Sequence, residues 1–367
     1  MQLDAIYRQV KVAGKEKISP MAKSPTYSHP LLADPRFQEP AGWRWHTFTT
    51  TQGHKLRCGS VHPKDSIADA VVVCLPGLRD FAEQYFETAH NMLQKNMAFW
   101  VIDWRGQGES DRYLSNRHKR HSGGYDQDIA DLYQLVDGYI LPSAVHPEVG
   151  RLPLVMLAHS MGAHLGLRFL HDCNVSSKGK QAFSAGFLCS PMFGVSALDF
   201  LSLRMSWLVA LLLCVFPRGY VPKYGGNWKT GYRALPQNAG KFSHDPIRLQ
   251  LQEAWFAEKP SLQTGGPTNR WLLETIKSCL KLNSKKYLKE IELPVHLAMA
   301  GNDRIVNNKL IERAANILPT ATLDNFPGAE HELLMESDQY RQPLLDHFFS
   351  FIEKNVLKKS NRGKTTF

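Results

Sequence analysis

Short apolar runs alternate with amphipathic segments along most of the chain. Apolar, β-branched runs of about four to eight residues are typical of strands buried on both faces of a parallel sheet. Such runs occur at 70–75, 98–103, 152–158, 185–189 and 294–300. Segments with helical periodicity occur at 83–95, 128–140, 162–170 and 344–356. The alternation predicts an α/β fold with a mostly parallel central sheet and helices on both faces.

Weaker patterns flank this alternation. Two strand-like stretches precede it, at 45–51 and 55–61, with Gly53 between them as a turn residue, and a third follows it at 320–326. Residues 1–40 are rich in Pro, Lys and Ser and show little periodicity, so we expect an arm there.

The alternation stops between about residues 190 and 290. This block is rich in Trp, Arg and Pro and mostly helical in pattern, and it is far too long for a connecting loop. We therefore expect a helical cap inserted over one end of the sheet. The predicted division is a basic N-terminal arm at 1–40, a core at 41–190 and 290–356, a cap (lid) at 191–289, and a basic C-terminal tail at 357–367.

The most apolar part of this cap is the segment 198–216. Asp199, Ser202 and Ser206 are spaced so that they predict one polar stripe along an otherwise apolar helix. The charge-free stretch, 205–216, is 12 residues long, whereas about 20 are needed to cross a bilayer. We expect a buried or interfacial helix, not a transmembrane one.

Composition and charge narrow the class of protein. The 367 residues are 43% hydrophobic and 21% charged, which is typical of a globular chain with a large core. The net charge of +10 is concentrated at the ends, with +3 in residues 1–30 and +5 in residues 354–367. A basic tail can steer a protein toward anionic surfaces or simply keep it in solution. No nucleic-acid-binding motif accompanies it, so no nucleic-acid partner is expected.

Cysteine spacing and the N-terminal sequence predict the compartment. None of the six cysteines lies in a CxxC pair, so we expect free thiols and a reducing environment. The first twenty residues lack the apolar run of a secretory signal. The expected location is the cytoplasm, and the cap could bring the protein into peripheral contact with the inner membrane.

The sharpest motif is Ala158-His159-Ser160-Met161-Gly162. It follows a predicted buried strand and opens a predicted helix, which is the context of a nucleophile elbow. The turn is tight and the strand and helix pass close together, so the flanking residues must be small. We expect Ser160 to be a nucleophile; the alternative is a serine that caps an ordinary helix.

An activated serine needs a histidine base that a carboxylate orients. In this architecture the chain order is Ser, then Asp or Glu, then His. His331 lies in a loop between the last predicted strand and the closing helix, where it can reach the carboxyl edge of the sheet, so it is the expected base. The other histidines after Ser160 are His164, His171, His296 and His347, for which structural roles are expected, and His244, which lies in the cap.

The orienting acid is expected just past the preceding strand. Asp303 follows the apolar run 295–300 and lies 28 residues before His331. Asp324 is the alternative, but it falls inside the last predicted strand and suggests a structural role. Glu330 and Glu332 flank the base and could tune it.

Acyl transfer also needs N–H donors for the developing oxyanion. One expected donor is the backbone amide of Met161, directly after the nucleophile. The other is the amide of Leu78, in the loop that follows the strand 70–75, where Gly77 permits a close backbone approach. The glycine-rich loop 103–110 lacks the GK[ST] ending of a phosphate loop, so a structural role beside the site is expected.

At this point the chain resembles a known family. The motifs LPG near residue 76, DWRGQGES, AHSMGA, AGNDRIV and PGAEHE, in this order, are similar to those of α/β-hydrolase serine hydrolases of the lysophospholipase and monoacylglycerol-lipase branch. In the cap, SPMFG, YRALP and GGPT resemble bacterial lysophospholipases, and the resemblance covers roughly residues 45–355. Two positions depart from the family pattern. Pro76 stands where many relatives have His, which bears on the assignment of Leu78, and Ala158 replaces the leading Gly, as in lysophospholipase-like members.

The resemblance implies a carboxylic ester hydrolase of lipid metabolism with Ser160, Asp303 and His331 as its catalytic triad and an acyl-enzyme intermediate. An amphiphilic lipid ester is the expected substrate, a lysophospholipid first, with monoacylglycerol lipase or general carboxylesterase activity as the alternatives. No cofactor is implied, and no metal site is expected because the chain has no HExxH motif or Cys/His cluster. An iminopeptidase would need an acidic group for the substrate amine, which no sequence feature identifies.

Basic residues in the cap leave one question open. They could meet a phosphate head group, or they could serve only cap packing and solvation. These residues are Arg204, Arg218, Lys223, Lys229 and Arg233.

Overall fold

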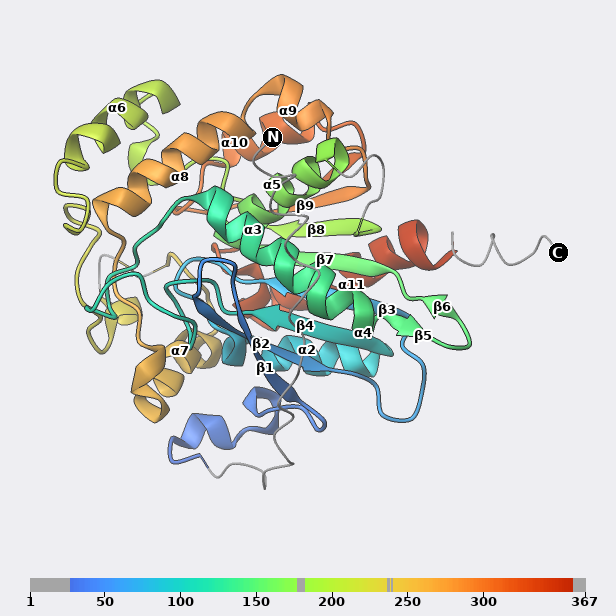
Figure 1. Cartoon of the computed structure of the whole chain (residues 1–367). Helices are drawn as coiled ribbons and strands as arrows, with labels where there is room; N and C mark the ends of the chain where they lie inside the picture. The colour runs from blue at the N-terminus through green and yellow to red at the C-terminus, as the bar shows by residue number, and fades with distance from the viewer. Residues whose placement is uncertain (1–26, 177–181, 236–237, 239, 359–367) are drawn as a thin grey trace.

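Figure 1 shows the computed structural model of the protein. The structure describes residues 27–176, 182–235, 238 and 240–358. Most of the predicted N-terminal arm, residues 1–26, and all but two residues of the predicted tail lie outside the described residues.

Eight strands form one sheet in the order β1-β2-β4-β3-β7-β8-β9-β10. Strands β1, β2 and β4 pair antiparallel, and all other neighbours pair parallel. The predicted α/β class with a mostly parallel sheet is therefore confirmed. The strands are β1 (Arg44–Thr49), β2 (Lys55–Val61), β3 (Ala70–Leu75), β4 (Met97–Ile102), β7 (Leu154–His159), β8 (Ala185–Cys189), β9 (Val295–Ala300) and β10 (Ala321–Phe326), and β5 (Val145–His146) and β6 (Gly150–Arg151) form a separate small hairpin.

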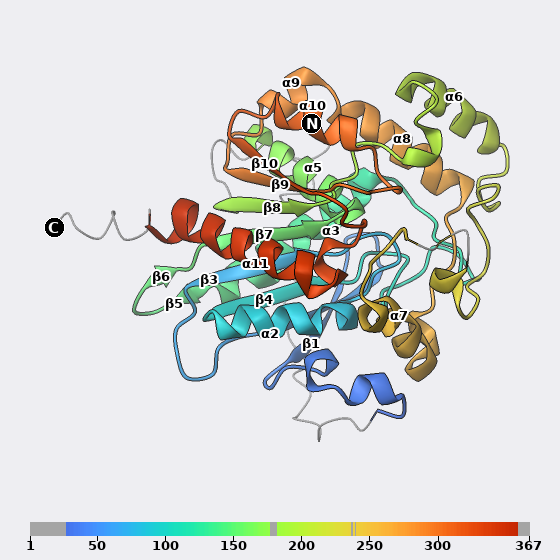
Figure 2. The ribbon, with the colours of Figure 1, turned by 180° about the vertical axis from the view of Figure 1, so that it is seen from behind.

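Helices cover both faces of the sheet, as Figures 1 and 2 show from opposite sides. One face packs against α3 (Tyr125–Leu135), α5 (Met161–Ser176) and α10 (Asn308–Ala315). The other face packs against α2 (Phe86–Gln94) and α11 (Asp338–Ile352). The short elements are η3 (Ala82–Tyr85), η4 (Val136–Ile140), α4 (Leu141–Ser143), η9 (Leu333–Met335) and η10 (Glu353–Leu357).

The strand order reverses at β3. The chain passes from β3 to β4 on one side and then to β7 on the other side of β3. Ligand sites of open α/β sheets lie where the strand order reverses in this way. The segments that follow β3 and β7, which contain Leu78 and Ser160, therefore flank this point.

The block predicted as a cap contributes α6 (Leu203–Leu213), α7 (Pro246–Glu258), α8 (Asn269–Leu282) and α9 (Lys285–Lys289), with the short elements η5 (Ser196–Leu198), η6 (Tyr232–Ala234) and η8 (Pro260–Leu262). Helix α8 packs in the same hydrophobic cluster as α3 and α5, through residues that include Trp271 and Ile276. Helix α7 packs in another cluster with Phe81, Phe86 and two residues before β1, Leu32 and Phe37. These last two belong to η1 (Pro30–Ala33) and η2 (Pro35–Phe37).

The prediction of one helix over 198–216 is wrong at both ends, because α6 spans only Leu203–Leu213. Helix α6 begins at Leu203 because the side chain of Ser202 accepts a hydrogen bond from the amide of Met205 and caps the helix. Asp199 lies before the helix, where its carboxylate accepts a hydrogen bond from Nδ2 of Asn307 at 2.6 Å. The expected polar stripe is therefore reduced to one helical residue, Ser206, which is buried.

Helix α6 buries one side against α8 and leaves an apolar side open. It lies at the periphery of the molecule in both Figure 1 and Figure 2. Leu212 and Phe216 are 73% and 75% exposed. Other exposed apolar side chains in and next to α6 are Phe200, Met205, Leu208, Leu211 and Val215. In the part of the chain that the structure describes, no helix combines the length and apolarity required to cross a bilayer.

A buried carboxyl in α3 makes stability depend on pH. Burial raises the pKa of Asp128 to about 7, with the charge of Arg120 opposing this shift and Asp131 adding to it. Its Oδ1 has no hydrogen-bond partner. Between about pH 4 and pH 7, therefore, the carboxyl of Asp128 is protonated in the folded chain and ionised in the unfolded chain. The contribution of this group to stability must fall as the pH rises from about 4 through 7.

We expect Asp128→Asn to stabilise the protein increasingly as the pH rises, because the amide resembles the protonated carboxyl and stays neutral. The gain in unfolding free energy should be about 1.5 kcal/mol at pH 5 and reach at most about 4 kcal/mol at pH 8. Urea unfolding of both proteins at the two pH values measures it. A difference between the proteins that does not change with pH would contradict the assignment.

Candidate active site

Ser160 occupies a sharp turn between β7 and α5. Its φ is +52°, a left-handed conformation that a non-glycine residue adopts only where its surroundings impose it. The amide of Ser160 donates to the carbonyl of Cys189 at 2.9 Å, which holds the turn against the end of β8. A Cβ on Gly162 would lie 2.1 Å from the carbonyl oxygen of Leu75. The small residue after the turn is therefore required by the close approach of α5 to the end of β3.

The hydroxyl of Ser160 is hydrogen-bonded to the predicted base. Its Oγ lies 2.9 Å from Nε2 of His331, and Nδ1 of the same imidazole lies 2.6 Å from Oδ2 of Asp303. Ser160 and His331 are 5% and 4% exposed, and the side chain of Asp303 is fully buried. The structure thus brings together three side chains that are separated by 28 to 171 residues along the chain.

Asp303 is held as an ionised acceptor. Its Oδ1 accepts from the amides of Ile305 and Val306 at 2.8 and 3.0 Å. Burial alone would raise the pKa of Asp303, but the adjacent His331 and the two amides keep it below its ordinary value. The carboxylate can therefore hold Nδ1 of the imidazole as the N–H donor, which leaves the lone pair of Nε2 toward the serine.

The start of the predicted cap braces the loop that carries Asp303. The amide of Ser196 donates to the carbonyl of Ile305, and its hydroxyl donates to the carbonyl of Val306. On the other side, the carbonyl of Met192 is hydrogen-bonded to Nδ1 of His164, in the first turns of α5. The segment after β8 therefore connects the acid loop with the nucleophile turn.

The backbone of His331 is fixed as well as its ring. Its carbonyl accepts from the hydroxyl of Ser190 at 2.8 Å and lies 3.3 Å from Nε2 of His159. Ser190 itself has a φ of +44°, so the residue that supports the base is in an unusual conformation. These contacts limit how far the imidazole can move from Ser160.

His159 and Asp80 form a buried pair behind the base. Nδ1 of His159 lies 3.3 Å from Oδ2 of Asp80, which also accepts from the amide of Gly77 and the hydroxyl of Tyr85, both at 2.8 Å. Burial alone would lower the pKa of His159, but Asp80 raises it above its ordinary value. A charged imidazole can donate from both ring nitrogens, to Asp80 and to the carbonyl of His331.

The same carboxylate shapes the loop that contains Leu78. Asp80 closes the Gly77–Asp80 turn, and Gln107 braces it from the other side. Nε2 of Gln107 donates to the carbonyls of Gly77 and Asp80 at 2.7 and 2.8 Å. The glycine-rich loop after β4 thus has the structural role expected of it. The amide of Met161 belongs to the first turn of α5, where N–H groups lack acceptors within the helix.

The remaining histidines considered from the sequence are not hydrogen-bonded to Ser160, His331 or Asp303. Asp324, the alternative acid, contacts two of them and not His331. The partners are Met192 for His164, Glu290 for His171, Glu336 for His244, and Asp324 for both His296 and His347.

Sequence reasoning missed four residues that position the site: His159, Asp80, Gln107 and Ser190. His159 lies next to Ser160 and Asp80 lies next to the Pro76–Arg79 loop, so adjacency to a candidate residue was an available signal. Which of many adjacent polar residues turns inward depends on three-dimensional contacts. Gln107 lies in the glycine-rich loop 103–110, for which a role beside the site was expected, but nothing distinguished this residue from its neighbours, and Ser190 had no such signal.

We expect His159→Asn to lower kcat by up to about 100-fold with little change in KM, because the backbone of His331 loses a support and small displacements of a base are costly. A steady-state comparison with His90→Asn, a partly buried histidine in α2, provides the control. Equal kcat values for His159→Asn and the wild-type protein would show that the pair does not position the base.

The chain matches a known family over most of its length. Residues 66–338 match the family model Hydrolase_4, described as serine aminopeptidase, S33. Among curated proteins, lysophospholipase L2 of Escherichia coli K12 is 26% identical over 308 residues, which cover 80% of this chain and 84% of that protein. A probable lysophospholipase L2 of Haemophilus influenzae is 23% identical over 290 residues, which cover 78% of this chain and 85% of that protein.

Solved structures share the fold at low sequence identity. A soluble variant of monoglyceride lipase from Saccharomyces cerevisiae superposes with a TM-score of 0.64 at 17% identity, covering 87% of this chain and 98% of that one. A carboxyl esterase from Bacillus coagulans also gives 0.64, at 14% identity, covering 86% of this chain and 100% of that one. At these identities the likeness describes the fold alone.

Proposed function

The chain belongs to the α/β-hydrolase family described as serine aminopeptidase, S33, and within this family we propose that it is a serine hydrolase that cleaves the acyl ester bond of lysophospholipids. The observation that supports the proposal most strongly is the hydrogen-bonded chain from Ser160 Oγ through His331 to Asp303, with distances of 2.9 and 2.6 Å. A buried serine hydroxyl next to an imidazole that a carboxylate orients is the arrangement that nucleophilic acyl transfer needs.

The first step forms an acyl-enzyme. Oγ of Ser160 attacks the ester carbonyl carbon while Nε2 of His331 takes the hydroxyl proton, and Asp303 stabilises the imidazolium that results. The amides of Leu78 and Met161 are the proposed donors to the oxyanion of the tetrahedral intermediate. The intermediate collapses as the C–O bond breaks, and Nε2–H of His331 gives its proton to the leaving glycerol oxygen.

The second step repeats the first with water. His331 removes a proton from the water molecule as the water oxygen attacks the acyl carbon, and the second tetrahedral intermediate releases the fatty acid and restores the hydroxyl of Ser160. Both steps use the chain's own groups and water, so the mechanism needs no cofactor.

A lysophospholipid is the first choice of substrate for two reasons. The relatives over four-fifths of the chain carry the name lysophospholipase L2. The cap is also basic: from residue 200 to residue 244 the sequence has six Lys or Arg and no Asp or Glu. Such a segment suits a phosphate-bearing head group more than the neutral glycerol of a monoacylglycerol.

One of the five basic residues considered from the sequence is not available for this role. Arg233 is buried, and its Nη1 pairs with Oε2 of Glu332 at 2.5 Å, next to the base. The other four, Arg204, Arg218, Lys223 and Lys229, are exposed. Any recognition of a head group by the cap must therefore come from those surface cations.

A substrate panel tests the proposal. It compares lysophosphatidylethanolamine and lysophosphatidylcholine with monoacylglycerols, p-nitrophenyl esters and amino-acid p-nitroanilides. We expect the highest kcat/KM for lysophospholipids. Hydrolysis of monoacylglycerols without activity on either lysophospholipid would select the monoacylglycerol-lipase alternative, and hydrolysis of short esters alone would select a general carboxylesterase. A preference for the anilides would replace ester hydrolysis by peptidase activity.

We further propose that the exposed face of α6 rests on an anionic lipid surface and brings the cap into contact with its amphiphilic substrate. Seven exposed apolar side chains lie in and next to α6, at residues 200–216, and the exposed cations Arg204, Arg218 and Lys223 lie within or close to this segment in sequence. Apolar area together with positive charge is typical of helices that bind in the plane of a membrane interface, and from residue 200 to residue 244 the sequence has no Asp or Glu.

Leu212→Asp should weaken binding to vesicles of phosphatidylethanolamine and phosphatidylglycerol by about tenfold or more. A leucine that moves from water into the lipid contributes about 1.5–3 kcal/mol to binding when it becomes largely buried there. Cosedimentation of the protein with vesicles measures this. The control is Val145→Asp, which replaces an apolar residue that is 60% exposed in the β5–β6 hairpin. Equal binding of both variants and the wild-type protein would contradict a lipid contact through α6.

A further inference from the structure

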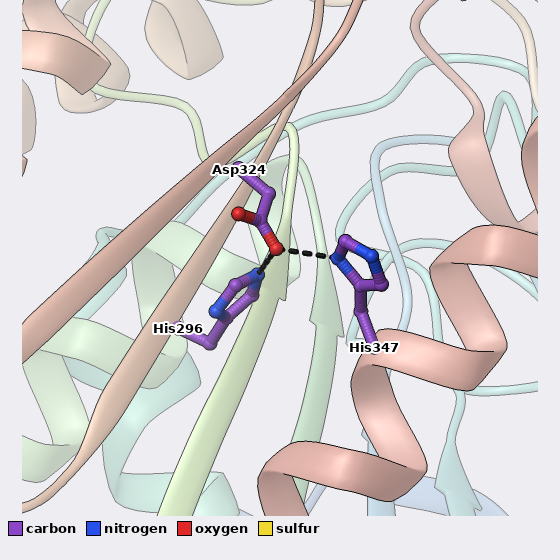
Figure 3. Close-up of side chains that lie close together, drawn as sticks. All are labelled: His296, Asp324 and His347. Carbon is purple, nitrogen blue, oxygen red and sulfur yellow. Dashed lines mark hydrogen bonds and ion pairs between the residues drawn. The ribbon is translucent and has the colours of Figure 1, made fainter.

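Three side chains that the proposed function does not use converge at the edge of the sheet. His296 lies on β9, Asp324 on the edge strand β10 and His347 on α11, and Figure 3 shows the carboxylate of Asp324 between the two imidazoles. Oδ2 of Asp324 lies 3.2 Å from Nε2 of His296 and 2.5 Å from Nδ1 of His347. Within the described residues this is the one group of three or more His, Cys, Asp or Glu side chains whose possible metal-binding atoms all lie within 4.8 Å of one another.

The strand register explains why the first two residues meet. Thr322 pairs with His296 across the parallel β9–β10 pair, so Asp324, two residues further along, lies on the same face of the sheet. That face is the one that α11 covers, which brings His347 to the same place.

His296 has a buried nitrogen without a hydrogen bond. The residue is only 5% exposed, and its Nε2 has no hydrogen-bond partner although it points toward Asp324 at an ion-pair distance. Its other nitrogen, Nδ1, is hydrogen-bonded to Oγ1 of Thr322 at 2.8 Å. A buried imidazole nitrogen that lies close to a carboxylate oxygen without a well-aligned hydrogen bond suits a cation held between the two groups.

The donor set and its surroundings suit Zn²⁺. Two imidazole nitrogens and one carboxylate oxygen, with a fourth position open to water, are a common set of ligands for this ion. Neighbouring ligand atoms of a tetrahedral zinc lie about 3.3 Å apart. The 3.2 Å between Nε2 of His296 and Oδ2 of Asp324 already fits this spacing. Nδ1 of His347 lies closer to Asp324, at 2.5 Å, but its side chain is 48% exposed and can rotate outward to reach the same spacing.

The outer contacts of the cluster resemble the support that metal-bound histidines receive. Thr322 holds the far nitrogen of His296, as outer partners of metal-ligating imidazoles do. The ring of Phe187 stacks on His296 at 4.5 Å, and that of Phe351 lies 5.6 Å away. These rings fix the plane of the imidazole and keep water from its inner side.

We propose that His296, Asp324 and His347 bind one Zn²⁺ ion that links the edge strand β10 and its neighbour β9 to the closing helix α11. The site lies on a different part of the sheet from Ser160 and does not depend on the proposed hydrolase function. Its expected role is structural, because the ion joins two strands and a helix through side chains that lie 28 and 23 residues apart in sequence.

Zinc binding by the tag-free, EDTA-treated chain tests the proposal. Titration against a chromophoric zinc chelator should show one bound Zn²⁺ per wild-type chain that His347→Ala and Asp324→Asn both lose. Thr322→Val should keep the site but weaken it by about 10–100-fold. Added Zn²⁺ should raise the melting temperature of the wild-type protein and leave that of His347→Ala unchanged.

The control variant is His146→Ala, which removes a histidine from the β5–β6 hairpin and should bind zinc like the wild-type protein. His347 is half exposed, so its replacement should leave the fold intact, and the melting curve without zinc verifies this. Equal zinc stoichiometry in the wild-type protein, His347→Ala and Asp324→Asn would overturn the proposal, as would the absence of a zinc-dependent rise in melting temperature.

Discussion

Ser160→Ala is expected to lower kcat for ester hydrolysis by about 10⁵–10⁶-fold, because without the hydroxyl no acyl-enzyme can form and only oxyanion stabilisation and binding remain. KM should change little, since the methyl group leaves the site its shape. Steady-state kinetics on the best substrate of the panel measures the loss.

Two comparisons make this result specific. The matched control is Ser206→Ala in α6, which removes a buried hydroxyl that has no hydrogen-bond partner and should therefore leave kcat and stability nearly unchanged. The melting temperature of Ser160→Ala should stay within a few degrees of the wild-type value. A folded Ser160→Ala protein that retained more than about a hundredth of the activity would show that another residue is the nucleophile.

Asp303→Asn should lower kcat by about 10⁴-fold at neutral pH. The amide can donate to Nδ1 of His331, which favours the tautomer whose proton faces Ser160 and leaves the base without its lone pair there. The side-chain oxygen of an asparagine can still accept from the amides of Ile305 and Val306, so the loop should remain folded.

Asp324→Asn is the matched control, because Asp324 is the residue that the sequence offered as the alternative to Asp303 for the orienting acid. It contacts His296 and His347 and not His331, so its replacement should leave kcat unchanged when both proteins are folded and assayed free of zinc. A large loss in Asp324→Asn, with Asp303→Asn fully active, would reverse the assignment of the acid.

The central strands could be predicted closely from the sequence. The strands β3 and β8 have the predicted bounds, because burial on both faces requires uninterrupted apolar residues such as the run Ala70–Leu75. Strand β2 also has the predicted bounds, although Lys55, Arg57 and Ser60 interrupt its apolar pattern. Helix ends were harder to predict. Helix α11 begins at Asp338 and not after Pro343 as predicted, since the buried Arg341 anchors its first turns to the carbonyl of Leu334.

Some elements left too weak a pattern to be predicted. Helix α10 spans eight residues and buries only Ile311 and Ala314, so its apolar periodicity is barely repeated. The start of α6 depends on a single side-chain cap at Ser202, inside a stretch whose apolar pattern continues on both sides. Local capping contacts of this kind are decided by a few atoms and not by periodicity.

The candidate site was more predictable than its supports. Ser160, Asp303 and His331 each follow a strand at the same edge of a parallel sheet, so topology alone brings them close together. The residues that support the triad depend on side-chain direction, which the sequence does not specify, and His159 and Gln107 were missed for that reason. The His296, Asp324 and His347 cluster was missed because it requires the β9–β10 register and the docking of α11 at once.

The most direct test of the account is the site of reaction with a fluorophosphonate. We expect the wild-type protein to gain one phosphonyl adduct, which peptide mass spectrometry locates at Ser160, and we expect His331→Ala to react far more slowly because the hydroxyl then lacks its base. An adduct on a different residue, or no adduct in a folded protein, would contradict the claim that His331 and Asp303 make Ser160 nucleophilic.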